Sequence, residues 1–386
     1  MKIHRVKNNE TVYDIAGEYG VSPVRLGFEN EIGNPRRLAT GRELLVQMPT
    51  RTYNVRRDDT EERIALRFGI SPERIRSLNP ELASGGKLYS GQLLVIKSMA
   101  PTLGMGIANG YYYQGCPREY LMRALPYLSY ITVCSAIAEG GKISTVFDDS
   151  YALDESKRHG KIILLRIYVK DDTNITSDDF ISSATLLAKS RGYDGITLPA
   201  IKEDEGALKL KKAMLERELL LFVERELKDT EECCHYADAT VLTYDKIHLD
   251  NVPSFDDGER AAMERYAEMC HPEGAFIDLS PFALAGEKYI EKTRAYEVAD
   301  RNKNTFSFDK ERLLLTGDIG RGRRSRHLIS ESLENTKAKL QLIGELGYLG
   351  ISFDIMRTPL AELLMFANLY SQPPSVIRRV VCNPPD

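Results

Sequence analysis

An internal repeat at the start of the chain constrains its fold more than any other feature. Residues 4–30, HRVKNNETVYDIAGEYGVSPVRLGFEN, align without a gap with residues 53–79, YNVRRDDTEERIALRFGISPERIRSLN. After one inserted residue, LATGRELLVQ at 38–47 aligns with LYSGQLLVIK at 88–97. A repeat of this length means that one small structural unit occurs twice.

Each copy has the pattern of two helices between two strands. Thr11 and Thr60 are good helix N-caps, and the apolar residues that follow them recur at helical spacing. Gly20 and Gly69 are typical of helix ends, and a Ser-Pro pair then opens a second helix. The closing runs, ELLVQM and QLLVIK, predict a final strand. The expected unit is therefore βααβ.

These framework residues resemble the LysM domain twice, over residues 1–49 and 51–97. The resemblance implies binding of an N-acetylglucosamine polymer, peptidoglycan or chitin, in a shallow groove between two loops. The loops follow the first strand and the second helix, and the implied contact residues are Asn9, Thr11, Asn30, Asp59, Thr60 and Asn79. The residues also allow a purely structural interpretation, in which the threonines cap helices and Asn30 and Asn79 shape turns.

The rest of the chain predicts a (β/α)8 TIM-like barrel, so the whole protein belongs to the α/β class. After a linker at 98–105, short apolar runs alternate with amphipathic stretches such as 177–192 and 332–347, up to a tail at 376–386. The expected strands lie at 107–114, 128–137, 160–169, 193–201, 218–224, 237–245, 275–284 and 347–356. Eight strands alternating with helices over residues 106–375 fit such a barrel.

The order of these runs resembles the family 18 glycoside hydrolases, most closely their LysM-bearing branch linked to bacterial spore peptidoglycan. The residues that carry the resemblance are GYYYQG, LPYLSYITVCSAIAEGGKI, RGYDGI, VLTYD and GYLGISFDI, in that order. The family signature on the fourth strand is DGxDxDxE. Alternate residues of a strand face the same side, so its acids meet inside the barrel, where the final Glu is the general acid.

This chain lacks the acids of that signature. Its segment GYDGITLPAI has Thr197 and Pro199 at the two later Asp positions and Ile201 at the Glu position. Loss of a general acid costs about 10²–10⁴-fold in rate. The barrel is therefore expected to be inactive or weakly active. The alternative is an acid relocated to Glu203 or Glu205, in a charged run that otherwise indicates a solvated loop.

Other barrel residues are candidates for glycan contact through the resemblance alone. They are Tyr112, Asp194, Tyr244, Asp245 and Phe353, the last at the position where the family has a tryptophan below the sugar. The chain has no tryptophan. Core packing near a barrel end is an equally good interpretation of each aromatic residue.

Charge and composition exclude some classes of function. The net charge of −4 argues against a general nucleic-acid binder, and the basic run IGRGRRSRH at 319–327 is expected to be an exposed loop. No apolar run is long enough for a membrane span, and the first residues lack the apolar stretch of a signal peptide. No cofactor is expected. Cytoplasmic synthesis followed by deposition on a spore envelope or cell wall fits this pattern.

The six cysteines include no CxxC motif. We expect reduced, mostly buried thiols. Cys233, Cys234 and His235 leave a metal site as a weaker alternative, because the other half of a zinc site at normal spacing is missing.

Three functions remain open. The favoured one is a glycan-binding protein whose hydrolase-like barrel has lost its catalytic acids. The second is an active N-acetylglucosaminidase that uses Glu203 or Glu205. The third is a structural protein of a spore coat whose barrel recruits other envelope proteins.

Overall fold

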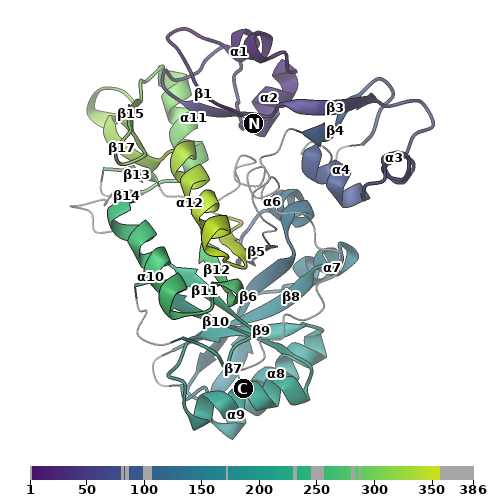
Figure 1. The fold of residues 1–386 in the computed structure, drawn as a ribbon, viewed down its shortest axis with the longest axis vertical. Helices are drawn as coiled ribbons and strands as arrows, with labels where there is room; N and C mark the ends of the chain where they lie inside the picture. The colour runs from purple at the N-terminus through teal and green to yellow at the C-terminus, as the bar shows by residue number, and fades with distance from the viewer. Residues whose placement is uncertain are drawn as a thin grey trace.

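The computed structural model describes residues 2–79, 82, 87–98, 107–170, 173–228, 233–244, 256–279, 283–286 and 288–356. Two small repeats lead into a barrel, and an inserted β-sheet stands beside the first repeat (Figure 1). No helix in these residues is long and apolar enough to cross a membrane. The predicted linker, the C-terminal tail and Asp245 lie almost entirely outside the described residues.

Both repeats form the predicted βααβ unit. The first consists of β1 (Lys2–Arg5), α1 (Val12–Tyr19), α2 (Pro23–Glu29) and β2 (Glu43–Val46). The second consists of β3 (Pro49–Asn54), α3 (Glu61–Phe68), α4 (Pro72–Leu78) and β4 (Leu93–Ser98). In each repeat the two strands pair antiparallel.

The predicted helix caps are confirmed in both repeats. The hydroxyl of Thr11 accepts a hydrogen bond from the backbone of Asp14, and that of Thr60 accepts one from Arg63. Gly20 and Gly69 adopt the left-handed conformation at the helix ends. Glycine has no Cβ and reaches this conformation at little cost, which explains its presence at both positions.

Eight parallel strands form a closed barrel. They are β5 (Ile107–Tyr112), β6 (Tyr130–Glu139), β8 (Ile162–Val169), β9 (Gly195–Pro199), β10 (Leu220–Glu226), β11 (Ala239–Thr243), β12 (Ala275–Asp278) and β18 (Gly350–Asp354). The sheet runs in the order β5-β18-β12-β11-β10-β9-β8-β6, and β5 also pairs with β6 to close it. β7 (Lys142–Thr145) adds an antiparallel arm to β6. Each predicted strand overlaps one of the eight, which confirms the barrel.

Helices surround the barrel, as the sequence predicts. They are α6 (Arg118–Ala124) with η1 (Leu125–Tyr127), α7 (Ser150–Arg158), α8 (Asp178–Arg191), α9 (Glu205–Glu216), η2 (Asp256–Arg260), α10 (Ala261–Met269), η3 (Pro272–Gly274) and α12 (Leu333–Leu346). α8 and α12 begin at the serine caps Ser177 and Ser332 and end at left-handed Gly192 and Gly347.

A small antiparallel sheet is inserted between β12 and α12, and the sequence analysis did not predict it. Its strands are β13 (Ala283–Ala285), β14 (Lys288–Tyr289), β15 (Ser307–Asp309), β16 (Leu314–Ile319) and β17 (Arg326–Glu331), and the inserted segment also contains the helices α11 (Lys292–Asn302) and η4 (Gly322–Arg324). The run 275–284, expected as one strand, is instead divided between β12 and β13. The basic run at 319–327 covers the exposed turn between β16 and β17 together with the adjoining ends of both strands.

The strand residues divide into an inner and an outer core. The inner core fills the barrel and consists of Ile107, Tyr111, Tyr130, Leu164, Phe222, Ala239, Val241 and Phe276. The neighbours of these residues along each strand pack in the larger core that lies under the helices. This alternation decides which side chains can line a site at the carboxyl ends of the strands.

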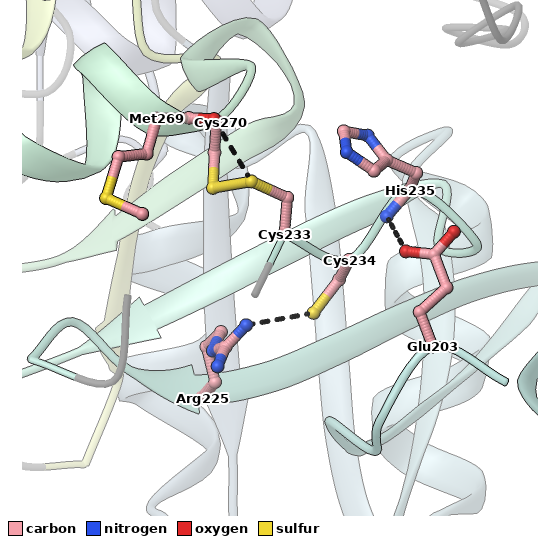
Figure 2. The surroundings of a disulfide bond; sticks show 7 residues. All are labelled: Glu203, Arg225, Cys233, Cys234, His235, Met269 and Cys270. Atoms are coloured by element: carbon pink, nitrogen blue, oxygen red, sulfur yellow. Dashed lines mark hydrogen bonds between the residues drawn. A yellow bond between two sulfur atoms is a disulfide. The ribbon is translucent and has the colours of Figure 1, made fainter. Parts of the chain in front are cut away.

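The expectation of reduced cysteines is wrong for one pair. Cys233 and Cys270 form a disulfide, with their Cα atoms 5.5 Å apart (Figure 2). In the fold, the connection between β10 and β11 lies next to the end of α10. Cys233 and Cys270 therefore meet, although they are 37 positions apart in the sequence. Cys116, Cys134 and Cys234 are free thiols. A disulfide sulfur is no thiolate ligand, so Cys233 does not fit the alternative metal site.

Candidate functional site

The inner face of β9 carries no carboxyl group. Register places Thr197 beside Arg166 of β8 and Phe222 of β10, and Pro199 beside Glu224. Thr197 is fully buried, and its hydroxyl has no hydrogen-bond partner among the described residues. Ile201 lies past the end of β9, and its backbone N–H donates to the Tyr236 hydroxyl at 2.9 Å.

Arg166 of β8 and Glu224 of β10 form an ion pair inside the barrel, beside Thr197 and Pro199 of β9. Arg166 Nε lies 2.8 Å from Glu224 Oε1, and Nη2 lies 2.8 Å from Oε2, so the contact has two prongs. The Tyr111 hydroxyl also donates to Oε1 at 2.7 Å. Arg166 and Tyr111 thus donate hydrogen bonds to both carboxyl oxygens of Glu224.

Burial and charge set the protonation of the groups around this pair. Burial lowers the pKa of Arg166, but the hydrogen bond and negative charge of Glu224 outweigh it and raise that pKa overall. Burial and then the charge of Glu224 raise the pKa of Tyr111 well above its usual value. Burial also raises the pKa of the neighbouring Cys134 thiol to about 12. The guanidinium is therefore charged, while the phenol and the thiol are neutral.

Two more carboxyl groups end strands in the same region. Asp278 is the last residue of β12, Asp354 is the last residue of β18, and both are partly buried. Asp354 lies close enough to Tyr113 for its charge to contribute to the raised pKa of that phenol, whose main cause is burial. The carboxyl ends of the strands thus present tyrosines, one guanidinium and carboxylates on strands other than β9.

The relocated-acid candidates lie in the segment that opens α9. Glu203 is exposed, and its Oε2 accepts a hydrogen bond from the backbone N–H of His235 at 3.1 Å (Figure 2). Glu205 is the exposed first residue of α9, directly after the helix cap Asp204. Glu203 thus holds the β10–β11 connection close to the disulfide.

The other barrel candidates among the described residues, Tyr112, Asp194, Tyr244 and Phe353, face away from the barrel interior. Phe353 is fully buried in the outer core, and Tyr112 packs there with its hydroxyl directed at the carbonyl of Cys116. Tyr244 packs against the same core. Asp194 precedes β9 and accepts a hydrogen bond from the backbone N–H of Ile163 at 2.8 Å. Tyr112, Tyr244 and Phe353 therefore lie at the carboxyl ends of strands but face the outer core, and Asp194 lies at the amino end of β9.

Sequence reasoning missed Tyr111, Arg166 and Glu224. The signal was present: Arg166 interrupts the apolar run IILLRIYV, and Glu224 is the first charged residue after the apolar residues of LLFVERE. Both have the same parity as the inward residues Leu164 and Phe222. A charged side chain that faces the barrel interior requires a partner of opposite charge. The strand order supplies this partner, because only β9 separates β8 from β10.

In the repeats, Asn30 and Asn79 have the same structural role. The amide of Asn30 donates to the carbonyls of Leu26 and Leu45 and accepts from the Leu45 N–H, at 2.9, 3.0 and 2.7 Å. Asn79 repeats this pattern with Ile75 and Val95, at 2.7, 2.9 and 2.8 Å. Both amides are buried and hold the second helix against the closing strand.

The loops after the first strands carry the remaining candidates. Asn9 is exposed and has a positive φ of 60°. Thr11 and Thr60 are helix caps. The carboxylate of Asp59 accepts from the Tyr53 hydroxyl at 2.6 Å and from the Arg56 N–H at 2.7 Å, and it is partly exposed. These loops are therefore braced from within each repeat and are accessible from outside.

Comparison with known proteins agrees with this architecture. The family model of the LysM domain matches residues 4–47 and 53–97. A search of curated protein sequences gave no match. The spore cortex-lytic enzyme SleL of Bacillus megaterium QM B1551 is similar in structure, with 18% identity, a TM-score of 0.69, and coverage of 95% of this chain and 97% of that chain. SleL of Bacillus cereus has the same identity and TM-score, and 98% of it is covered.

Chitinases match the barrel alone. A chitinase from Chromobacterium violaceum ATCC 12472 is 14% identical, with a TM-score of 0.58 over 69% of this chain and all of that chain (100%). The GH18 chitinase from Cycas revoluta, solved in complex with (GlcNAc)3, is 12% identical with a TM-score of 0.54, over 68% of this chain and 99% of that chain. This chain therefore consists of two LysM domains followed by a barrel with the fold of the GH18 chitinases and SleL.

Proposed function

We propose that this protein binds an N-acetylglucosamine polymer of the cell wall through its LysM domains and does not hydrolyse it. Two LysM domains with accessible loops support the binding. The similar structures include enzymes named for spore cortex lysis and a chitinase in complex with (GlcNAc)3. Peptidoglycan, and spore cortex in particular, is the polymer that fits both.

The observation that carries the absence of hydrolysis is the inner face of β9 and its surroundings. Thr197 and Pro199 have no carboxyl group, and Arg166 engages both oxygens of Glu224, which stands at the register position beside Pro199. A general acid must hold a proton within hydrogen-bond reach of the leaving oxygen. Glu203 and Glu205 are exposed on the segment that opens α9.

We further propose that the protein is deposited on the spore envelope, where the barrel contacts other envelope proteins. The support is the resemblance over nearly the full chain to SleL, combined with a barrel that keeps its fold without acids on β9. In this account the LysM domains bind the polymer, and the barrel surface is available for other contacts.

Co-sedimentation tests the binding. The full-length protein is mixed with insoluble peptidoglycan, with chitin and with cellulose, which lacks the acetamide group. The account predicts pelleting with the first two and not with cellulose, together with release by soluble N-acetylglucosamine oligomers. Equal pelleting with cellulose, or none with any polymer, would contradict it.

A further inference from the structure

We infer that the two LysM domains perform different tasks: the first fixes the pair to the barrel, and the second carries the glycan binding. This inference rests on the proposed function. The two repeats share a fold, but their aligned positions differ in what covers them.

The second loop of the expected groove is engaged in the first LysM domain. Glu31, in the loop after α2, pairs with Arg123 of α6 and accepts a hydrogen bond from the Thr293 hydroxyl of α11 at 3.0 Å. The preceding carbonyl, of Asn30, accepts from Arg42 Nη2 at 2.6 Å. Arg42 itself pairs with Asp300 of α11, and both are buried. A polymer in this groove would compete with the barrel for the loop.

The closing strand of the first LysM domain is also part of this interface. Glu43 is fully buried, and its Oε2 accepts from the backbone N–H of Leu333, at the start of α12, at 2.6 Å. Thr40 exchanges backbone hydrogen bonds with the inserted sheet, to Asn304 O at 3.1 Å and from Phe306 N at 2.7 Å. Figure 1 shows this domain next to α11 and the inserted strands.

A glycine marks how closely the first domain approaches the barrel. A Cβ on Gly41 would lie 2.1 Å from the carbonyl oxygen of Phe306, which no side chain tolerates. The aligned glycine of the second domain, Gly91, has no neighbouring atom within 4 Å of such a Cβ. The first domain is therefore docked at a position where the second is open.

Two further aligned pairs show the same contrast. Ala39 is fully buried against the inserted sheet, whereas its counterpart Tyr89 is 66% exposed. Glu43 is fully buried, whereas its counterpart Leu93 is 51% exposed. The second domain thus leaves uncovered the surface that the first uses for docking.

The second domain also contacts its neighbours, through α4 and through Leu78 and Asn79, which lead into its own second groove loop. Its helix α4 packs on η1, and Glu73 lies near Lys161, at the start of β8. Arg25 of the first domain donates to the carbonyl of Leu78 at 2.6 Å. The hydrogen bonds that the structure gives the loop at 56–60 stay within the second domain, as those of the aligned loop at 7–11 stay within the first. The first groove loop of the second domain is accordingly free of the barrel.

Matched substitutions in the full-length protein test this division. Thr11→Arg and Thr60→Arg place a large side chain at aligned positions, and each removes one helix cap, so the folding cost is similar at about 1 kcal/mol. Binding to insoluble peptidoglycan is measured by depletion. We expect Thr60→Arg to weaken binding about tenfold or more and Thr11→Arg to change it less than about twofold. Equal losses, or a larger loss from Thr11→Arg, would overturn the inference.

Hydrogen exchange of the unchanged protein provides a second test that does not depend on variants folding. Soluble N-acetylglucosamine oligomers are expected to protect amides in 56–60 and to leave those in 7–11 unaffected. Protection of both loops would refute the division while supporting the proposed function. Failure of the wild type to bind any N-acetylglucosamine polymer would refute the proposed function and this inference with it.

Discussion

Arg166 and Glu224 face each other across one intervening strand of the barrel and form a two-pronged ion pair, with both N–O distances at 2.8 Å. β9 lies between their strands, and its Thr197 stands at the register position beside Arg166. The ion pair therefore lies beside β9, the strand on which the family 18 resemblance locates the catalytic acids. The contribution of this ion pair to the free energy of unfolding decides whether it stabilises the barrel.

Breaking this pair is expected to destabilise the protein. Arg166→Met leaves the Glu224 carboxylate without its main partner in a largely buried place and should cost about 3 kcal/mol in the free energy of unfolding. The double variant Arg166→Met/Glu224→Leu removes both charges and should recover most of that loss. Urea unfolding measures both. Equal losses from the single and double variants would show that the pair does not act as a unit.

The Cys233–Cys270 disulfide is expected to stabilise the barrel. Cys233→Ser opens a link between residues 37 positions apart, and such loops contribute about 3–4 kcal/mol by restricting the unfolded chain. A reductant should lower the thermal midpoint of the wild type and leave that of Cys233→Ser unchanged. Sensitivity of both proteins to the same reductant would point to a different disulfide. The free Cys234→Ser variant is the matched control.

Lys161 predicts a dependence of stability on alkaline pH. Burial lowers its pKa to about 8, against the opposing charge of Glu73. The unfolded lysine, with a pKa of about 10.4, binds more protons than the folded one above pH 8, so stability should rise from about pH 8 to 10. Lys161→Met should flatten this rise and stabilise the protein most below pH 8. An unchanged slope in the variant would contradict the assignment.

The two asparagine amides are expected to be structural and not glycan contacts. Asn79→Ala leaves the backbone N–H and C=O of Val95 without their partner, at a cost of about 2–3 kcal/mol. Asn30→Ala should cost a similar amount through Leu45. The fraction that remains folded should bind peptidoglycan as tightly as the wild type. A loss of affinity without a loss of stability would make the amides direct contacts.

The sequence predicts those parts of the fold that depend on local patterns. Thr11, Gly20 and their counterparts mark the repeat because caps and helix ends need particular residue types wherever they occur. The barrel strands are recognisable because buried parallel strands are nearly continuous apolar runs.

The features that the sequence did not predict depend on tertiary contacts. Cys233 and Cys270 are adjacent only after the β10–β11 connection and α10 have packed. The strands of the inserted sheet are short, and α11 and the first LysM domain cover their apolar residues. Apolar runs this short resemble those of loops, so the sequence does not indicate a sheet here. Phe353 and Tyr112 were assigned to strands correctly, but resemblance alone does not reveal that they face the helices while Tyr111 faces inward.

Reducing-end release is the most direct test of the central claim that the protein binds its polymer without cutting it. Purified spore cortex and N-acetylglucosamine oligomers are incubated with the wild type and with a Glu203→Gln/Glu205→Gln variant. The account predicts no release above the blank from either protein under conditions in which the wild type pellets with the polymer. Release by the wild type that the double substitution abolishes would contradict it and assign the chemistry to the segment before α9. Release by both proteins would also contradict it and direct attention to Asp278 and Asp354.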